Sequence, residues 1–183
     1  MAKTELDILR EVSQRLSTAN IAFMLTGSVA MNYYAQPRMT RDIDLVVALT
    51  SADAEIVVRL FETDFYLDSE VVADAIARRS MFNLIHLDSV IKVDCIVRKD
   101  DAFRLEEFAR RKEIVLEDFH TWIVSREDLI LSKLAWAKDS GSEIQLRDVR
   151  NLLAPECDLG YLRSRALSLS VRDSFEDLVK HHG

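Results

Sequence analysis

Apolar positions recur with two different spacings along the chain. Up to about residue 124, short runs of branched and aromatic residues alternate with segments whose apolar residues recur every three or four positions. These are the patterns of strands and of amphipathic helices. Beyond residue 125 only the helical spacing continues. The pattern therefore predicts an α+β fold, in which a small mixed β-sheet flanked by helices is followed by a C-terminal helical region.

The strands of the first part are expected where apolar runs stand between turn residues. They are 21–25, 42–49, 65–67, 81–87, 90–97, 114–116 and 121–124. Only Asp88 and Ser89 separate 81–87 from 90–97, so these two runs are expected to form a hairpin. Helical spacing predicts helices over 3–19, 29–36, 52–62, 69–79 and 102–110.

The helical part opens at Ser125. The segment 125–128 resembles a helix N-cap followed by acidic residues, and it predicts a helix that runs to about Lys138. Further helical patterns cover 143–153, 158–169 and 172–180. We therefore expect two domains, an α/β domain over 1–124 and a helical region over 125–183 that closes a cleft.

Charge and composition limit the classes of partner. The net charge of −7 disfavours a protein that holds nucleic acid mainly by neutralising phosphates, and it suits a cationic acceptor or a site that concentrates divalent metal. No apolar run approaches the ~20 residues that span a bilayer. The N-terminus lacks a signal-peptide stretch, so we expect a cytoplasmic protein without a membrane partner. Cys95 and Cys157 are far apart and are expected to be reduced structural thiols.

Asp42 and Asp44 begin one of the predicted strands, separated by a single residue. Side chains alternate between the two faces of a strand, so these carboxylates are expected on the same side. Two neighbouring carboxylates repel unless a cation lies between them or one of them is protonated. Oxygen ligands of this kind suit a hard divalent ion such as Mg²⁺.

Asp94 is a further acid, within the apolar run 90–97. An unpaired carboxylate buried there would be strongly unfavourable, so it needs a metal ion, a cationic partner or the wet end of the strand. Lys92 shares its face and is a structural explanation that stays open. If this strand neighbours the strand of Asp42 and Asp44, the three acids can converge on one edge of the sheet.

Gly27 and Ser28 stand between an apolar strand and an apolar helix in a chain with few glycines. Such a turn presents backbone N–H groups and a hydroxyl at a helix N-terminus, which is a ready anion site. A polyphosphate on one side and metal-binding acids on the other is the arrangement for phosphoryl-type transfer with two metals.

Together these residues resemble the signature of the nucleotidyltransferase superfamily, which has the DNA polymerase β-like fold. The matching features are Gly27-Ser28, a helix, Asp42-Ile43-Asp44 entering an apolar strand, and a third acid in a later strand. The segment 38–44, with the sequence RMTRDID, is especially similar to the AbiEii-type branch, and 126–134 and 145–149 are similar to the helical half of that branch. The resemblance covers about residues 21–153.

The resemblance implies roles for the acids and the turn. Asp42 and Asp44 would hold the metal of the nucleoside triphosphate (NTP), with Mg²⁺ or Mn²⁺ as the cofactor. Asp94 would complete a second metal site and draw the proton from an acceptor hydroxyl. Gly27 and Ser28 would hold the β- and γ-phosphates. Together they would transfer a nucleoside monophosphate and release pyrophosphate.

Further nucleotide-binding residues are expected outside this group. The resemblance implies that Lys133, on the first helix of the tail, meets the triphosphate, and that Asp148 orients Lys133 or an arginine. A solvent-facing Lys133 is the alternative. Arg38 and Arg41 are candidates for binding substrate phosphates, although arginines beside aspartates also serve to neutralise a crowded acidic site.

The acceptor is not specified by these residues. Within the family, acceptors include tRNA ends, protein side chains and the hydroxyls of antibiotics, and the AbiEii likeness implies a toxin with a possible antitoxin partner. A non-catalytic member that binds nucleotide or a partner protein, and a structural ion site on an unrelated fold, are the other hypotheses.

Overall fold

The computed structural model describes residues 3–37 and 42–181. They form two compact units: residues 3–29 and 42–124 make the sheet-containing unit, and residues 30–37 and 125–181 make the helical unit. The predicted phosphate ligands Arg38 and Arg41 lie outside the described residues. The predicted α+β class, with a mixed sheet flanked by helices, is confirmed.

The sheet-containing unit is built on a seven-stranded mixed sheet with the order β3-β4-β5-β2-β1-β7-β6. The neighbours β2 and β5 are parallel, as are β1 and β7, and the remaining pairs are antiparallel. The strands are β1 Phe23–Thr26, β2 Asp42–Val47, β3 Phe65–Tyr66, β4 Met81–His86, β5 Lys92–Val97, β6 Lys112–Leu116 and β7 Phe119–Ile123.

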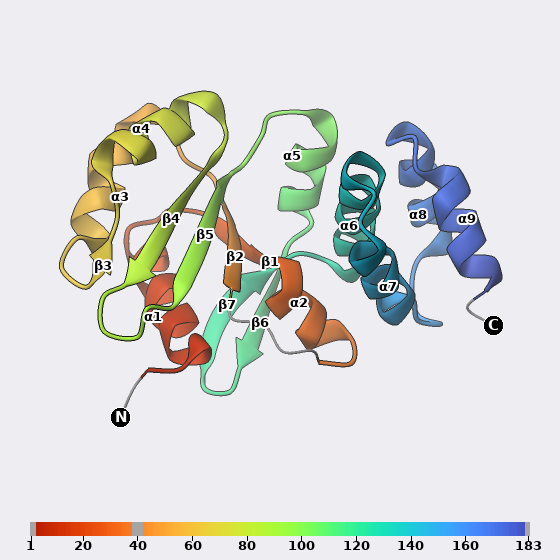
Figure 1. The fold of residues 1–183 in the computed structure, drawn as a ribbon, viewed down its shortest axis with the longest axis horizontal. Helices are drawn as coiled ribbons and strands as arrows, with labels where there is room; N and C mark the ends of the chain where they lie inside the picture. The colour runs from red at the N-terminus through yellow and green to blue at the C-terminus, as the bar shows by residue number, and fades with distance from the viewer. Residues whose placement is uncertain (1–2, 38–41, 182–183) are drawn as a thin grey trace. The chain divides into compact units, whose positions relative to one another are not determined.

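Helices flank this sheet (Figure 1). The helices α3 and α4 pack on each other, and α4 lies against β4 near the end of the sheet that β3 forms. The helices that begin in this unit are α1 Glu5–Thr18, α2 Gly27–Tyr34, the short 3₁₀ helix η1 Ser51–Asp53, α3 Ala54–Phe61, α4 Ser69–Arg78 and α5 Ala102–Ala109. The sequence placed the start of α2 two residues late, because Gly27 itself is the first residue of the helix.

Side-chain caps explain where several helices begin. Thr4 and Asp7 form a reciprocal capping box at α1. Asp68 and Asp101 accept backbone N–H groups at the starts of α4 and α5. Ser125 does the same for α6, as the sequence predicted. Each cap satisfies N–H groups that the helix leaves without a partner.

The core of the sheet-containing unit includes the central strands of the sheet. All four residues of β1 are buried, and Ile43 and Leu45 of β2 are fully buried. The apolar face predicted for α1 is buried too, with Val12 at its centre. Burial of this kind contributes about 1.5–3 kcal/mol for each large apolar side chain. Cys95 and Cys157 are buried and unbridged, which confirms their prediction as reduced thiols.

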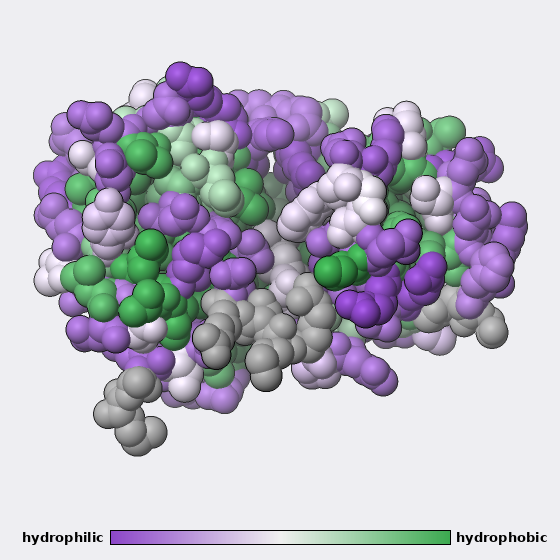
Figure 2. Space-filling model, in the orientation of Figure 1, coloured by the Kyte–Doolittle hydropathy of each residue, from purple (hydrophilic) through white to green (hydrophobic). Residues whose placement is uncertain are grey.

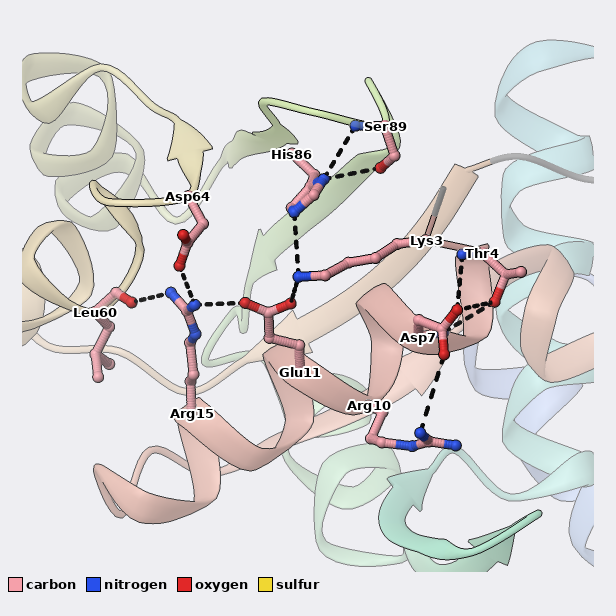
Figure 3. Close-up of polar contacts among 10 residues, drawn as sticks. All are labelled: Lys3, Thr4, Asp7, Arg10, Glu11, Arg15, Leu60, Asp64, His86 and Ser89. Atoms are coloured by element: carbon pink, nitrogen blue, oxygen red, sulfur yellow. Dashed lines mark hydrogen bonds and ion pairs between the residues drawn. The ribbon is translucent and has the colours of Figure 1, made fainter. Parts of the chain in front are cut away.

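A polar network ties α1 to the β3–β4 end of the sheet (Figure 3). Arg15 donates to the carboxylates of Glu11 and Asp64 and, at 2.7 Å, to the carbonyl of Leu60. The hydrogen bond from Arg15 lowers the pKa of the Asp64 carboxyl. These contacts fix α1 against a part of the sheet that has only a two-residue edge strand.

The helical unit contains the C-terminal helices. They are α6 Arg126–Ser140, α7 Glu143–Leu152, α8 Leu159–Ser168 and α9 Arg172–Lys180. Gly141 ends α6 with a left-handed backbone, φ +68°. The fully buried Asp128 accepts a hydrogen bond from Tyr161 at 2.6 Å, which links α6 to α8.

The face of the protein drawn in Figure 2 is mainly hydrophilic, with apolar groups among the charged residues. Exposed apolar side chains of the sheet-containing unit include Tyr66, Leu87 and Val90. Exposed apolar residues of this kind are ordinary on protein surfaces. In the part of the chain that the structure describes, no helix is long and apolar enough to cross a membrane.

Candidate active site

A row of polar side chains crosses four neighbouring strands. Asn83 of β4 pairs with Asp94 of β5, Asp94 is in register with Asp44 of β2, and Asp44 pairs with Thr26 of β1. Residues directly opposite each other on neighbouring strands project from the same face. The sheet therefore brings Asp94 onto the face of Asp44, and by alternation onto that of Asp42.

The three acids lie at the centre of the strand order. The sequence predicted that they converge if their two strands are neighbours, and β2 and β5 are neighbours that carry the acids in their first residues. The central position arises because β1 and the β4 arm of the hairpin flank this pair of strands. Asp94 is the most enclosed acid, with 11% of its side chain exposed, whereas 60% of the Asp42 side chain is exposed.

Lys92 lies among these carboxylates. Its Nζ is 3.1 Å from Oδ2 of Asp94 and 3.8 Å from Oδ1 of Asp42. The hydrogen bond to Asp94 raises the pKa of the Lys92 ammonium, and the charges of Asp94, Asp42 and Asp44 raise it further, against the effect of burial. The cationic partner that Asp94 needs is therefore present in the chain itself.

Asn83 is a site residue that the sequence reasoning missed. Its Nδ2 donates to Oδ1 of Asp94, so donors from two strands meet the two oxygens of that carboxylate. A signal was available, because a hairpin that turns at Asp88 and Ser89 sets Asn83 directly opposite Asp94. An amide in that register restrains the orientation of the acid.

Gly27 and Asp44 are in close contact. Gly27 has a φ of +63°, and a Cβ atom added to it would lie 2.1 Å from Oδ2 and 2.9 Å from Cβ of Asp44. Only a residue without a side chain allows this approach. The turn predicted to hold phosphate thus lies directly beside one of the predicted metal ligands, and Ser28 follows it in the first turn of α2.

The donor set suits a hard divalent cation. The three carboxylates offer oxygen ligands, and two of them, Asp42 and Asp94, already contact a cation in the form of the Lys92 ammonium. Within residues 3–37 and 42–181, no group of three or more carboxylate, imidazole or thiol side chains is drawn together tightly enough to hold a metal ion as it stands. Asp94 is held by Asn83 and Lys92, and Lys92 also lies 3.8 Å from Asp42.

Lys133 and Asp148 form a buried pair inside the helical unit. Nζ of Lys133 is 2.7 Å from Oδ2 of Asp148 and 3.1 Å from Oε1 of Gln145. Only 4% of the Lys133 side chain and 1% of the Asp148 side chain are exposed. Lys133 is therefore not on a solvent face, and Asp148 orients it. Their role in nucleotide binding stays a prediction.

Tyrosines at the end of α2 belong to the helical unit. Burial raises the pKa of Tyr34 to about 12, and its carbonyl accepts a hydrogen bond from Arg126 at 3.2 Å. Tyr33 packs edge-on against Tyr34 and is 46% exposed. Tyr34 is a packed structural residue, and Tyr33 presents an aromatic surface to solvent.

Solved structures of similar shape are nucleotidyltransferase-like proteins. An antigenic nucleotidyltransferase-like protein from Paracoccidioides brasiliensis is similar with a TM-score of 0.58 and 17% identity over 93% of each chain. The antibiotic-resistance factor ANT(2'')-Ia gives a TM-score of 0.58 and 15% identity, over 100% of this chain and 98% of that one. The lincosamide antibiotic adenylyltransferase LnuA, bound to lincomycin, gives 0.51 and 16%, over 81% and 94%.

These likenesses establish the fold. No protein-family model matches the chain, and no curated protein matches it in sequence. The chain therefore has the mixed α+β fold of nucleotidyltransferase-like proteins. At these identities the similarity does not extend to substrates or to individual site residues.

Proposed function

We propose that the protein is a metal-dependent nucleotidyltransferase that moves a nucleoside monophosphate from an NTP to a hydroxyl group of an acceptor. One observation carries the proposal: Asp44 and Asp94 are in register on parallel strands, and the Gly27 turn lies against Asp44. The proposed metal ligand Asp44, the proposed base Asp94 and the proposed phosphate-binding turn therefore lie close to one another. The fold of the structural neighbours supports the same reaction class.

Each residue of the group has a distinct task. Asp42 and Asp44 bind a divalent ion, and Gly27 and Ser28 hold the triphosphate through backbone N–H groups and a hydroxyl. The bound ion would neutralise charge on the phosphate oxygens during the transfer. The group therefore acts mainly by positioning the donor beside an acceptor oxygen.

Asp94 accepts the proton of the acceptor hydroxyl. Each carboxylate oxygen has two lone pairs, so the hydrogen bonds from Asn83 and Lys92 leave capacity for a hydroxyl proton. These bonds also fix the direction of the carboxylate, which a general base requires. Loss of the Asp94 charge should therefore abolish transfer while NTP remains bound at Asp42 and Asp44.

A cationic small molecule is the acceptor class that the charge distribution favours. The whole net charge of −7 falls in residues 1–29 and 39–124, because the remainder carries equal numbers of acidic and basic residues. The unit with the three acids thus attracts cations. Two of the structural neighbours are an antibiotic-resistance factor and an antibiotic adenylyltransferase.

A tRNA or protein acceptor is the second candidate. The similarity of segment 38–44 to the AbiEii-type branch favours it, and it would make the protein the toxin of a toxin–antitoxin pair. In that case the labelled product would be a macromolecule and expression without a partner would arrest growth.

Transfer of label from NTP to a component of cell extract tests the proposal. The full-length protein is incubated with Mg²⁺, extract and each of the four NTPs labelled at the α-phosphate, and products are separated into small molecules, RNA and protein. The double variant Asp42→Asn, Asp44→Asn should lose the label, and Asp74→Asn on α4 is the matched control that keeps it. Equal labelling by wild type and double variant would exclude the mechanism, and tight NTP binding without pyrophosphate release would indicate a non-catalytic member.

A further inference from the structure

Lys92 is a cation that the strand register places directly among the three acids of this site. It stands opposite Asp42 in the register of β2 and β5, just as Asp94 stands opposite Asp44. Three carboxylates and one ammonium therefore occupy the four corners of a patch on one face of two parallel strands. The Lys92 ammonium therefore lies near two of the carboxylates, 3.1 Å from Asp94 and 3.8 Å from Asp42.

We propose that Lys92 is a built-in cation of this site, and that the site consequently binds a single divalent ion, at Asp42 and Asp44, instead of two. The proposal rests on the proposed function, because it concerns the metal requirement of the same acids. It departs from the two-metal expectation drawn from the sequence, in which Asp94 completes a second metal site.

The contacts of Asp94 support this assignment. Oδ2 of Asp94 is 3.1 Å from Nζ of Lys92, and Oδ1 accepts a hydrogen bond from Asn83. Only 11% of the Asp94 side chain is exposed. A second divalent ion at Asp94 would have to approach within a few ångströms of an ammonium group, and like charges at that distance repel strongly. The ion would bind only after Lys92 had moved away.

The other side of the site is arranged differently. Asp44 lies between Asp94 and the Gly27 turn, because β2 is between β5 and β1 in the sheet. An ion at Asp42 and Asp44 therefore lies next to the turn that would hold the phosphates. The side of the site toward β5, where the acceptor hydroxyl would meet Asp94, already has its positive charge in Lys92.

In the proposed reaction, the two cations therefore have separate roles. Asp42 and Asp44 would hold the divalent ion that serves the donor phosphates, and the Lys92 ammonium holds the Asp94 carboxylate in place for the incoming hydroxyl. A lysine charge does not depend on metal supply, so the acceptor side of the site is complete in the protein alone. Lys92 is in this sense a positioning residue, acting through Asp94.

Electron paramagnetic resonance of bound Mn²⁺ distinguishes one ion from two. Two ions in a two-metal site are about 3.5–4 Å apart, and their spins couple, whereas one ion keeps the hyperfine pattern of an isolated centre. The full-length protein is saturated with α,β-methylene-ATP and Mn²⁺, and bound ions per chain are counted by equilibrium dialysis. An adenine nucleotide is chosen because a structural neighbour is an adenylyltransferase.

The proposal predicts one uncoupled Mn²⁺ per chain in the wild type. Lys92→Gln removes the charge and should take up a second, spin-coupled ion, whereas Lys92→Arg keeps the charge and should bind one. Far-UV circular dichroism of each variant checks that it is folded. A coupled pair in the wild type, or a single ion in folded Lys92→Gln, would overturn the proposal and leave the proposed function intact.

If the proposed function itself is wrong, the same Mn²⁺ experiment gives a different result. If the wild type retains neither Mn²⁺ nor the nucleotide, both proposals are wrong. The double variant Asp42→Asn, Asp44→Asn should lose the single ion of the wild type. An unchanged ion count in this variant would place the ion elsewhere and would also overturn the assignment.

Discussion

Gly27 illustrates what a single residue contributes to this site. The sequence identified it as a turn glycine before a helix, and the structure adds that it touches Asp44. That contact joins β2 to the start of α2, two segments whose approach depends on the pairing of β1 with β2. A local pattern cannot reveal it, because the pairing of strands is set by packing across the whole sheet.

Replacing Gly27 by alanine should be more harmful than the same change at Gly141. Both glycines have a left-handed backbone, which costs an alanine about 1–2 kcal/mol, but only the Gly27 side chain would collide with another residue. Because even Cβ of Asp44 is too close, rotation of the carboxylate does not remove the clash. We expect Gly27→Ala to lower the free energy of unfolding in urea by about 1–3 kcal/mol more than Gly141→Ala does. Equal losses would show that Asp44 is not held against the turn.

The pair of Lys133 and Asp148 should be critical for stability. Removing one partner of a buried ion pair leaves an uncompensated charge, which typically costs about 3–5 kcal/mol. We therefore expect a loss of that size for Lys133→Met in chemical unfolding, and recovery of most of it in the double variant Lys133→Met, Asp148→Leu. Lys138→Met, at an exposed position of the same helix, is the control and should change the stability by about 0.5 kcal/mol or less.

Among the elements, the hairpin of β4 and β5 was the most predictable part of the site. The turn at Asp88 and Ser89 defines the register, and the register places Asn83 opposite Asp94. The parallel pairing of β2 with β5 was less accessible, because about fifty residues separate the two strands and nothing local specifies their contact. The sequence could state that the acids converge if these strands are neighbours, but it could not show that they are.

The network that anchors α1 should make stability depend on pH through Asp64. Arg15 lowers the pKa of this carboxyl below its ordinary 3.8, so its stabilising contribution is complete above the ordinary value and is lost as the pH falls through the lowered one. Asp64→Asn should lower the urea midpoint at neutral pH, and its difference from the wild type should vanish once the pH falls below the lowered pKa of Asp64. Asp88→Asn, an exposed carboxylate in the β4–β5 turn, is the control. A difference that persists at low pH would show that packing, and not charge, links α1 to this region.

At the scale of the whole molecule, the order of strand and helix patterns was enough to predict the fold class. A strand, a Gly-Ser turn, a helix and a strand opening with two acids gave the architecture that the solved neighbours share. The grouping of residues 30–37 with the helical unit was not predictable, since this segment lies within the α/β part of the sequence. The acceptor is equally absent from the local patterns, because the identified residues serve the donor nucleotide.

The central claim is that the protein transfers a nucleoside monophosphate and that Asp42, Asp44 and Asp94 are required for it. The most direct measurement compares NTP labelled at the α-phosphate with NTP labelled at the γ-phosphate, in extract with Mg²⁺, for the wild type and for Asp94→Asn. We predict that the acceptor gains label only from the α-phosphate, and only with the wild type. Label that arrives from the γ-phosphate, or equally from Asp94→Asn, would contradict the claim.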